Sequence, residues 1–522
     1  MGVDGATFDI IKPLVRDGEL PNFAKLMDRG SFCTLKSTVP LLSPAAWTTF
    51  STGVRPGKHG IFNFLARKNG TYEIDPASSE LRRVKPVWKV AGEAGRKVVV
   101  MNVPATFPPD AVNGIMIAGD PTPFHDERRL FPSGSYRGLE QHFGKGFLKP
   151  APPFRGESSF LDTLLHSVEL WTNIAKFTME QEDWDLATVV YTATDTAQHF
   201  FWRTFDKAHP LYSHKSAERY GNAILAVYKK IDWALGELVK LADEHTHIVV
   251  LSDHGFGPLY QAVPLTGWLV EKGYLTYLSG PKGKGYRGLA DTVKFVLSRL
   301  RLAEGLPPLS ILRDVDWTKT KAYFLGVSGD IFVNLKGREP QGIVAPGREY
   351  DELIEKMSRE LESLRLADGS APVEAVLRGK DLYPDSAGSP DLFVKWAKGF
   401  DIVKEGEPDS IVRALRKRSV NAWSGTHMEE GILILAGEAI ERAALRGASI
   451  EDVAPTIYHL LGLPVPALLE GKVLADAIRS DRLKAPEMCN LDIMEKGFSE
   501  TIFSDEDARR VEESLRNLGY LE

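Results

Sequence analysis

Three features are scarce in this 522-residue chain, and each scarcity excludes a class of protein. Cysteine occurs only at Cys33 and Cys489, with no C-x-x-C spacing, which argues against a disulfide scaffold or a cysteine-based zinc site and favours a reducing compartment. No apolar run is long enough for a transmembrane helix. A basic excess is also absent, because the formal net charge is −6. We therefore expect neither a nucleic-acid polymer nor an acidic membrane as partner.

The N-terminal segment MGVDGATFDIIKP also lacks the basic region that opens a secretory signal, so we expect a cytoplasmic protein. What the chain does contain is ordinary for a globular protein, at 43% hydrophobic and 26% charged residues. The length indicates two to four domains, or one large α/β core with insertions.

Short apolar runs alternate with helical patterns along the chain. The segments 95–104, 113–121 and 184–195 each carry an apolar run bounded by polar or turn-forming residues, which is typical of parallel strands buried on both faces. An amphipathic helix is predicted over 215–243, and it leads into the strand THIVVLSDHG. This order indicates βαβ units and a doubly wound α/β sheet, in which ligands lie at the carboxyl ends of the strands.

The composition changes after residue 255, which sets the predicted domains. The segment 256–385 contains the basic GPKGKGYRG, a predicted helix over 289–302 and the β-like KAYFLGVSGDIFVNL, and we interpret it as an inserted cap. The segments 390–396 and 431–437 read as strands of the core, and 454–463 as a helix. We predict a core of 1–255 and 386–480, the cap 256–385, and a helical tail 481–522. A surface helix in this tail would begin at Ser504 as N-cap and end near Gly519.

Ser43 is the candidate nucleophile. The stretch SPAAWTTF is typical of a helix start, with Ser43 as N-cap and Pro44 as first helical residue. Taken alone, this serine would only cap a helix. The same position also presents free N–H groups to a phosphate, and a serine hydroxyl beside a metal ion can attack phosphorus.

Six acidic and imidazole side chains are the candidate metal ligands, because each lies at the edge of an apolar run or helix. Asp195 and His199 are four residues apart and would project from one helix face. Each of the six has an ordinary structural interpretation alone, and His427 is expected in a loop. Together they suit two divalent cations, zinc or manganese. The six are Asp4, Asp195, His199, Asp253, His254 and His427. His59, in RPGKHGIF, is expected to be structural.

These motifs, in this order, resemble the alkaline phosphatase superfamily in its type I phosphodiesterase/nucleotide pyrophosphatase branch. The resemblance covers roughly residues 1 to 475 and rests on GVDGA, SPAAWTTFSTGVRPGKHGI, TDTAQH, SDHGFGP, GTH and DVAPTIYHLLGLPVP. It implies an α/β/α sandwich and a phosphoester hydrolase, either a phosphodiesterase or a phosphatase. It also implies two divalent metal ions, usually zinc, with manganese in the mutase relatives.

Residue roles also follow from the resemblance. Ser43 would take up the phosphoryl group as a covalent intermediate and would reach one of the two ions. That ion would be held by Asp4, Asp253 and His254, and the other by Asp195, His199 and His427. Relatives have a full apolar strand before the motif aspartate, whereas only three residues precede Asp4 here. We therefore expect a short central strand and an Asp4 that is held less rigidly.

Two other functions stay open at this point. A phosphotransferase or mutase would need an arginine-rich closing domain, and Arg299, Arg301 and Arg313 in the insertion form no clear cluster. A non-catalytic binding protein on the same fold predicts broken ligand positions, whereas all six are present. The partner is expected to be a small phosphorylated substrate, whose identity, like the oligomeric state, is open. Four cap aromatics would stack on it or, more simply, fill the cap core; they are Tyr274, Tyr277, Tyr286 and Phe324.

Overall fold

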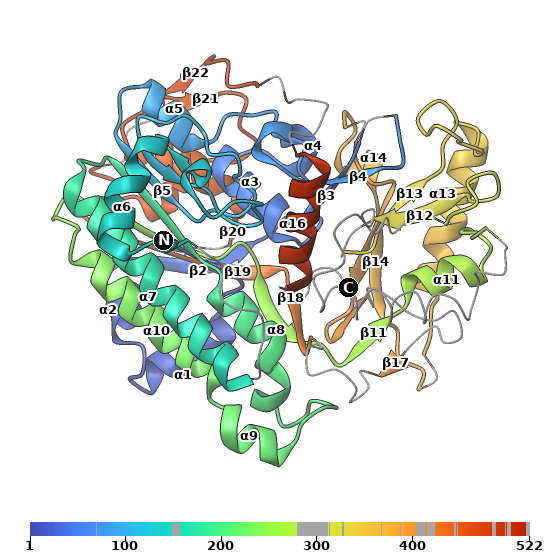
Figure 1. Cartoon of the computed structure of the whole chain (residues 1–522), viewed down its shortest axis with the longest axis horizontal. Helices are drawn as coiled ribbons and strands as arrows, with labels where there is room; N and C mark the ends of the chain where they lie inside the picture. The colour runs from blue at the N-terminus through green and yellow to red at the C-terminus, as the bar shows by residue number, and fades with distance from the viewer. Residues whose placement is uncertain are drawn as a thin grey trace.

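The computed structural model of the chain shows two lobes (Figure 1). It describes residues 1–68, 70–148, 157–278, 312, 314–325, 328–366, 368–386, 388–402, 413–414, 423–442, 445, 447–482, 487–495, 497 and 503–517. The predicted helix 289–302, Tyr286 and the three arginines of the insertion lie outside these residues, as does Gly519. In the described ranges, no helix has both the length and the apolar character to cross a membrane.

The larger lobe is built on a nine-stranded mixed sheet. Its strand order is β20 (Ala448–Ser449), β2 (Ser31–Lys36), β19 (Glu430–Ala436), β9 (Ile248–Leu251), β1 (Gly2–Val3), β8 (Leu186–Tyr191), β5 (Val98–Met101), β6 (Gly114–Ile117) and β7 (Leu130–Phe131). The strands β9, β1, β8, β5 and β6 run parallel to one another. The strands predicted within 95–104, 113–121, 184–195 and 431–437 are confirmed.

Helices cover both faces of this sheet, so the lobe is the three-layer α/β/α sandwich that the sequence predicts. Val99 and Met101 pack on one helical layer, and Val98 and Val100 on the other, as the two-residue period of a strand requires. The first layer contains α1 (Phe8–Arg16), α2 (Pro21–Arg29), α6 (Tyr136–Phe143), α7 (Glu157–Gln181), α8 (Ala193–Phe205) and α10 (Ala223–Val239). The second contains α3 (Ser43–Thr52), α5 (Val87–Glu93) and α15 (Val453–Leu460).

The single helix predicted over 215–243 is wrong in its continuity. The chain forms α9 (His214–Tyr220) and α10, separated by a turn at Gly221 and Asn222. At this turn the Thr204 hydroxyl donates to the Tyr220 carbonyl at 2.9 Å, and a Cβ on Gly221 would lie 2.6 Å from the Ala217 carbonyl oxygen. The apolar periodicity continues across the break, which is why the sequence alone does not reveal it.

The smaller lobe has its own sheet and core. The sheet order is β12 (Ala322–Leu325), β13 (Asp330–Val333), β15 (Leu392–Trp396) and β14 (Val373–Arg378), packed against α11 (Leu265–Glu271) and α13 (Arg348–Glu362). A second small sheet contains β16 (Phe400–Ile402), β11 (Gln261–Val263) and β17 (Arg413–Ala414). Tyr274 and Phe324 are buried in this lobe's core and Tyr277 packs against it, so these aromatics fill the lobe.

One strand was assigned to the wrong sheet. The segment 390–396 was expected in the large sheet, but β15 pairs with β13 and β14 in the smaller lobe. A short apolar run such as Leu392, Phe393 and Val394 shows that a strand is buried, not which sheet buries it. The division of the chain into core, cap and tail stays a prediction.

The tail helix α16 (Asp505–Asn517) begins as predicted, because the Asp507 N–H donates to the Ser504 hydroxyl at 3.2 Å. It is more than a surface helix. Val511 and Leu515 are buried against Leu42 and Phe64 of the large lobe. Figure 1 shows α16, in red, between the two lobes.

Candidate metal centre and nucleophile

The candidate nucleophile opens α3 but does not cap it. The N-cap is Leu42, and Ser43 is the first helical residue, one position later than predicted. The Ser43 Oγ lies instead 3.3 Å from His254 Nε2, and the side chain is buried.

The six candidate ligands come from four segments that meet at the carboxyl ends of neighbouring strands. Asp4 follows β1, and Asp253 and His254 join β9 to β10 (Gly255–Pro258). Asp195 and His199 lie on the first turns of α8, directly after β8. His427 lies on β18 (Gly425–Met428), which pairs with β10, and so the loop expected there is a strand.

The first potential metal-ligand group contains Asp195, His199 and His427. The Asp195 Oδ1 lies 3.4 Å from His199 Nε2 and 3.2 Å from His427 Nε2. The two Nε2 atoms are 3.1 Å apart. Three ligand atoms of this chemistry and spacing suit one divalent cation.

The second group contains Asp4, Asp195 and His254, so Asp195 belongs to both. The His254 Nε2 lies 3.6 Å from Asp4 Oδ1 and 3.9 Å from Asp195 Oδ1. It also lies 3.3 Å from Asp253 Oδ2. A carboxylate that belongs to both groups is compatible with two adjacent cations.

All three histidines hold their rings in the orientation that metal binding needs. Each Nδ1 is within hydrogen-bond distance of a backbone carbonyl oxygen. The partners are Gly425 for His199 at 2.9 Å, Gly255 for His254 at 2.9 Å, and Leu41 for His427 at 3.0 Å. A carbonyl only accepts, so Nδ1 carries the proton and the lone pair lies on Nε2. Such outer partners fix the tautomer of metal-binding histidines.

Asp4 is not loosely held, contrary to the expectation from its short strand. Its backbone N–H donates to Tyr191 at 2.9 Å, and its Oδ2 accepts from Trp47 Nε1 at 3.0 Å. Trp47 is fully buried one helical turn after Ser43. This tryptophan therefore ties the nucleophile helix to the ligand on β1. No motif marks it, because a buried tryptophan in a helix usually serves packing alone.

The electrostatics of the cluster fit a cation. Burial and the neighbouring acids raise the pKa of Asp4 well above its ordinary value and that of Asp253 to about 7. Burial lowers the pKa of His199 to about 4, and burial with the nearby His427 lowers that of His254 strongly. Asp4 Oδ1 and Asp253 Oδ2 are buried and accept no hydrogen bond from the described residues. The pKa of His427 is raised in spite of its burial, because Asp195 contacts it. Buried imidazoles and repelling carboxylates are a donor set that a divalent cation would stabilise.

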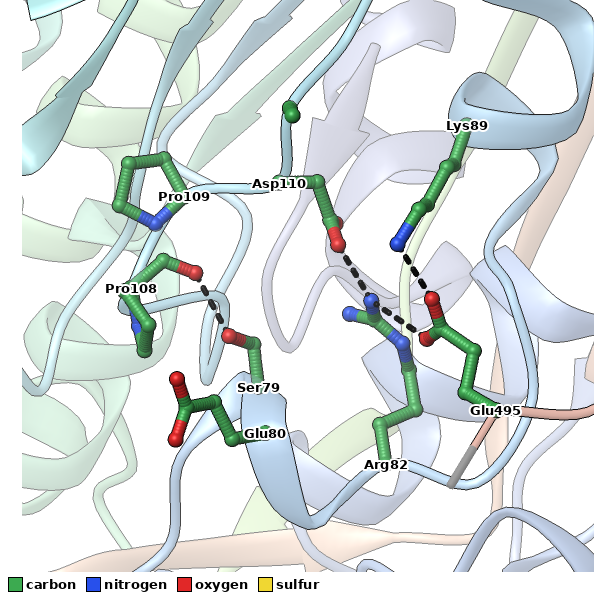
Figure 2. A pocket seen from close by; sticks show the side chains of 9 residues that line it. Ser79, Glu80, Arg82, Lys89, Pro108, Pro109, Asp110 and Glu495 are labelled. Carbon is green, nitrogen blue, oxygen red and sulfur yellow. Dashed lines mark hydrogen bonds and ion pairs between the residues drawn. The ribbon is translucent and has the colours of Figure 1, made fainter. Parts of the chain in front are cut away.

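Among the described residues, a groove between the lobes reaches the cluster, and a second hollow of the large lobe does not include any of the six ligands. The groove of about 1190 Å³ runs between the lobes and is lined by Leu42 and His427 together with Asp330 of the smaller lobe. The second hollow of about 350 Å³ contains Arg82 and Lys89 (Figure 2).

Figure 2 shows that this second hollow is internally neutralised. Arg82 lies 2.5 Å from Asp110 and 3.4 Å from Glu495, and Lys89 pairs with Glu495. Its two cations already have carboxylate partners, so it offers no free positive charge to a phosphate. His59 also has a structural role, since it is buried and bonds Thr49 at 2.9 Å.

Comparisons with known proteins identify a family and a fold for the chain. The sequence model of the family described as type I phosphodiesterase / nucleotide pyrophosphatase matches residues 1–426. A phosphonoacetate hydrolase from Sinorhizobium meliloti 1021, solved with phosphonoformate, is similar with a TM-score of 0.52 and 14% identity, over 88% of this chain and 94% of that one. An inactive threonine-to-alanine variant of murine ectonucleotide pyrophosphatase / phosphodiesterase 5, solved with AMP, has a TM-score of 0.50 and 14% identity, over 92% and 98%. At this identity they show the fold. No curated protein sequence gives a significant match.

Proposed function

The chain belongs to the type I phosphodiesterase/nucleotide pyrophosphatase family of metal-dependent phosphoester hydrolases, and from this premise we propose that Ser43 attacks the substrate's phosphorus. The reaction would proceed through a phosphoseryl intermediate beside two divalent cations. The observation that carries the proposal is the position of the Ser43 Oγ, 3.3 Å from a candidate ligand, His254 Nε2. The shared carboxylate of Asp195 supports two ions rather than one.

The residues of the chain have separate tasks in this proposal. When bound, the cations would lower the pKa of the Ser43 hydroxyl and offset charge on the phosphoryl oxygens. Ser43 supplies the attacking oxygen from a fixed position at the start of α3. The free N–H groups of the same helix start face the developing negative charge. Trp47 and the three backbone carbonyls behind the histidines hold the ligand geometry.

Three further properties belong to the proposal. Zinc is favoured over manganese because three of the six ligands are imidazoles. The substrate is a small phosphorylated molecule whose organic group occupies the groove between the lobes. A cytoplasmic location and the absence of nucleic-acid and membrane partners stay predictions from composition.

The test is the Ser43→Ala variant, with Ser51→Ala on the same helix as matched control. The Ser51 hydroxyl is buried and donates to the Thr48 carbonyl at 3.1 Å. We expect Ser43→Ala to lower kcat by roughly 10⁴-fold or more with unchanged metal content, and Ser51→Ala to change it little. Hydrolysis of bis-p-nitrophenyl phosphate and p-nitrophenyl phosphate, measured with zinc and manganese, separates diesterase from monoesterase. Near-normal turnover of Ser43→Ala would remove Ser43 from the nucleophilic role.

A further inference from the structure

A polar notch interrupts the wall of the groove between the lobes. Ser328 and Asp330, which flank the turn before β13 in the smaller lobe, line the groove at this notch. Asn63, which follows α4 (Pro56–His59), contacts Asp330 there. Asp330 lines the same groove as Leu42 and His427, although only 2% of its surface is exposed. The notch therefore faces the space into which a substrate on Ser43 would extend.

Asp330 differs from the other buried carboxylates of the molecule outside the metal cluster. Asp391 is held by Arg338 and Tyr350, Asp110 by Arg82 and Trp88, and Asp232 by Asn22 and the Phe23 N–H. For Asp330 the described residues provide no cation and no backbone donor. They provide the Asn63 amide, whose Nδ2 donates to Asp330 Oδ2 at 3.4 Å, and the Ser328 hydroxyl beside it.

The consequence for protonation follows from this environment. Burial raises the pKa of Asp330 to about 7, since no positive charge compensates its carboxylate. In a neutral solution a substantial fraction of Asp330 side chains is therefore protonated. The Asn63 Oδ1 is buried and has no hydrogen-bond partner among the described residues. An unused acceptor of this kind is complementary to a polar atom of a ligand.

We propose that Asp330 donates the proton that the departing oxygen of the substrate requires, with Asn63 and Ser328 holding the carboxyl group in place. This inference rests on the proposed function. Ser43 attacks as the alkoxide, its proton already lost to solvent, and is released as the alkoxide at the end of the cycle. As the bond between Ser43 Oγ and phosphorus forms and the bond to the leaving oxygen breaks, the Asp330 proton passes to that oxygen, and the alcohol leaves neutral. The water that then cleaves the phosphoseryl bond gives its oxygen to phosphorus and its proton back to the Asp330 carboxylate. Ser43 is released, and the sum is ester plus water to alcohol plus phosphate.

A leaving-group series tests the proposal. Asp330→Asn keeps the size of the side chain and removes the proton, and Asp381→Asn, on the exposed face of α14 (Gly379–Leu382), is the matched control. For p-nitrophenyl esters, whose leaving group needs no proton, we expect kcat/KM of Asp330→Asn to fall by no more than about 3-fold. For phenyl and alkyl esters of the same type it should fall by roughly 10²–10⁴-fold. The wild-type loss of activity at alkaline pH should vanish in the variant.

Further measurements separate this role from a structural one. Asp330→Glu, which keeps a displaced proton, should restore part of the activity toward alkyl esters. Metal content and thermal midpoint should match the wild type, and the infrared band of a protonated carboxylic acid should be lost only in Asp330→Asn. An equal fall for all leaving groups, or no fall for alkyl esters, would overturn the proposal while leaving Ser43 intact. Failure of the wild type on the whole series would instead reject the proposed function, and this inference with it.

Discussion

The two lobes each bury a cluster of acidic side chains, but only the smaller lobe supplies the charges that neutralise it. There, Arg338 contacts Asp391 through two nitrogens at 3.0 and 2.6 Å and also pairs with Glu339. Arg67 at the end of β3 (Leu65–Arg67) pairs with Glu339 as well. In the large lobe, Asp4, Asp195 and Asp253 converge on histidines instead. Burial lowers the pKa of His199 and His254, whereas Asp195 raises that of His427 in spite of its burial.

This difference separates two uses of buried charge. A carboxylate matched by arginine is satisfied by the protein itself and fixes a packing arrangement. A carboxylate cluster with more negative than positive groups raises the free energy of the folded protein until a cation binds. Asp330 lies between these two cases, since it has neither arginine nor a place among the ligands.

The arginine-matched cluster should give the largest stability effect. Replacing Arg338 by Ala leaves Asp391 buried without its cation, and we expect a loss of about 3–5 kcal/mol in the free energy of unfolding. The control is Arg348→Ala, because Arg348 forms an exposed pair with Glu352 and should contribute less than about 1 kcal/mol. Urea unfolding of both variants measures the difference. If the two losses were equal, the arginine pairing would not be what holds this cluster.

The unmatched cluster should respond to metal instead. Adding zinc to chelator-treated protein at 100 to 1,000 times the Kd should stabilise it by roughly 3–4 kcal/mol. Asp195 belongs to both ligand groups, so Asp195→Asn should remove most of this gain. Arg338→Ala should keep it, because its side chain takes no part in the cluster. A zinc-induced rise in thermal midpoint that survives Asp195→Asn would place the ion elsewhere.

Asp330 should make the free energy of unfolding depend on pH. Because the pKa of Asp330 is about 7 in the folded protein and lower when unfolded, the folded state binds the proton more tightly at intermediate pH. Its stabilising contribution is therefore complete at low pH and is lost as the pH rises through the folded pKa. From about pH 5 to about pH 7, wild type should lose roughly 2–3 kcal/mol relative to Asp330→Asn. Chemical unfolding across pH measures this, and a flat difference like that of Asp381→Asn would contradict it.

Sequence patterns predict the strands and the ligand positions of the large lobe better than they predict the tertiary contacts of the site. Continuous apolar runs such as Val98–Val100 identify the buried strands, and acids or histidines at their ends indicate where ligands converge. The register of Ser43 was missed by one residue, because serine followed by proline fits both the N-cap and the first helical position. The bond from Trp47 to Asp4 joins residues 43 positions apart and leaves no local pattern.

The proton donor inferred at Asp330 is equally invisible in the sequence. In SGDIFV it reads as a turn residue before a strand. Its environment depends on Asn63, 267 positions earlier in the chain, and on the absence of a nearby cation in the described structure. Such properties arise from tertiary packing, which single-sequence reasoning does not resolve.

The wide spacing of the ligands along the chain has a consequence for biosynthesis. Asp4 leaves the ribosome first and His427 more than four hundred residues later. A nascent chain that stops short of β18 lacks one ligand of the first group, and a protease cut between β9 and β18 that separates the fragments has the same effect. Metal occupancy would thus report whether the segments from β1 to β18 have come together. We expect molecules truncated or nicked before β18 to stay inactive rather than to hydrolyse phosphoesters indiscriminately.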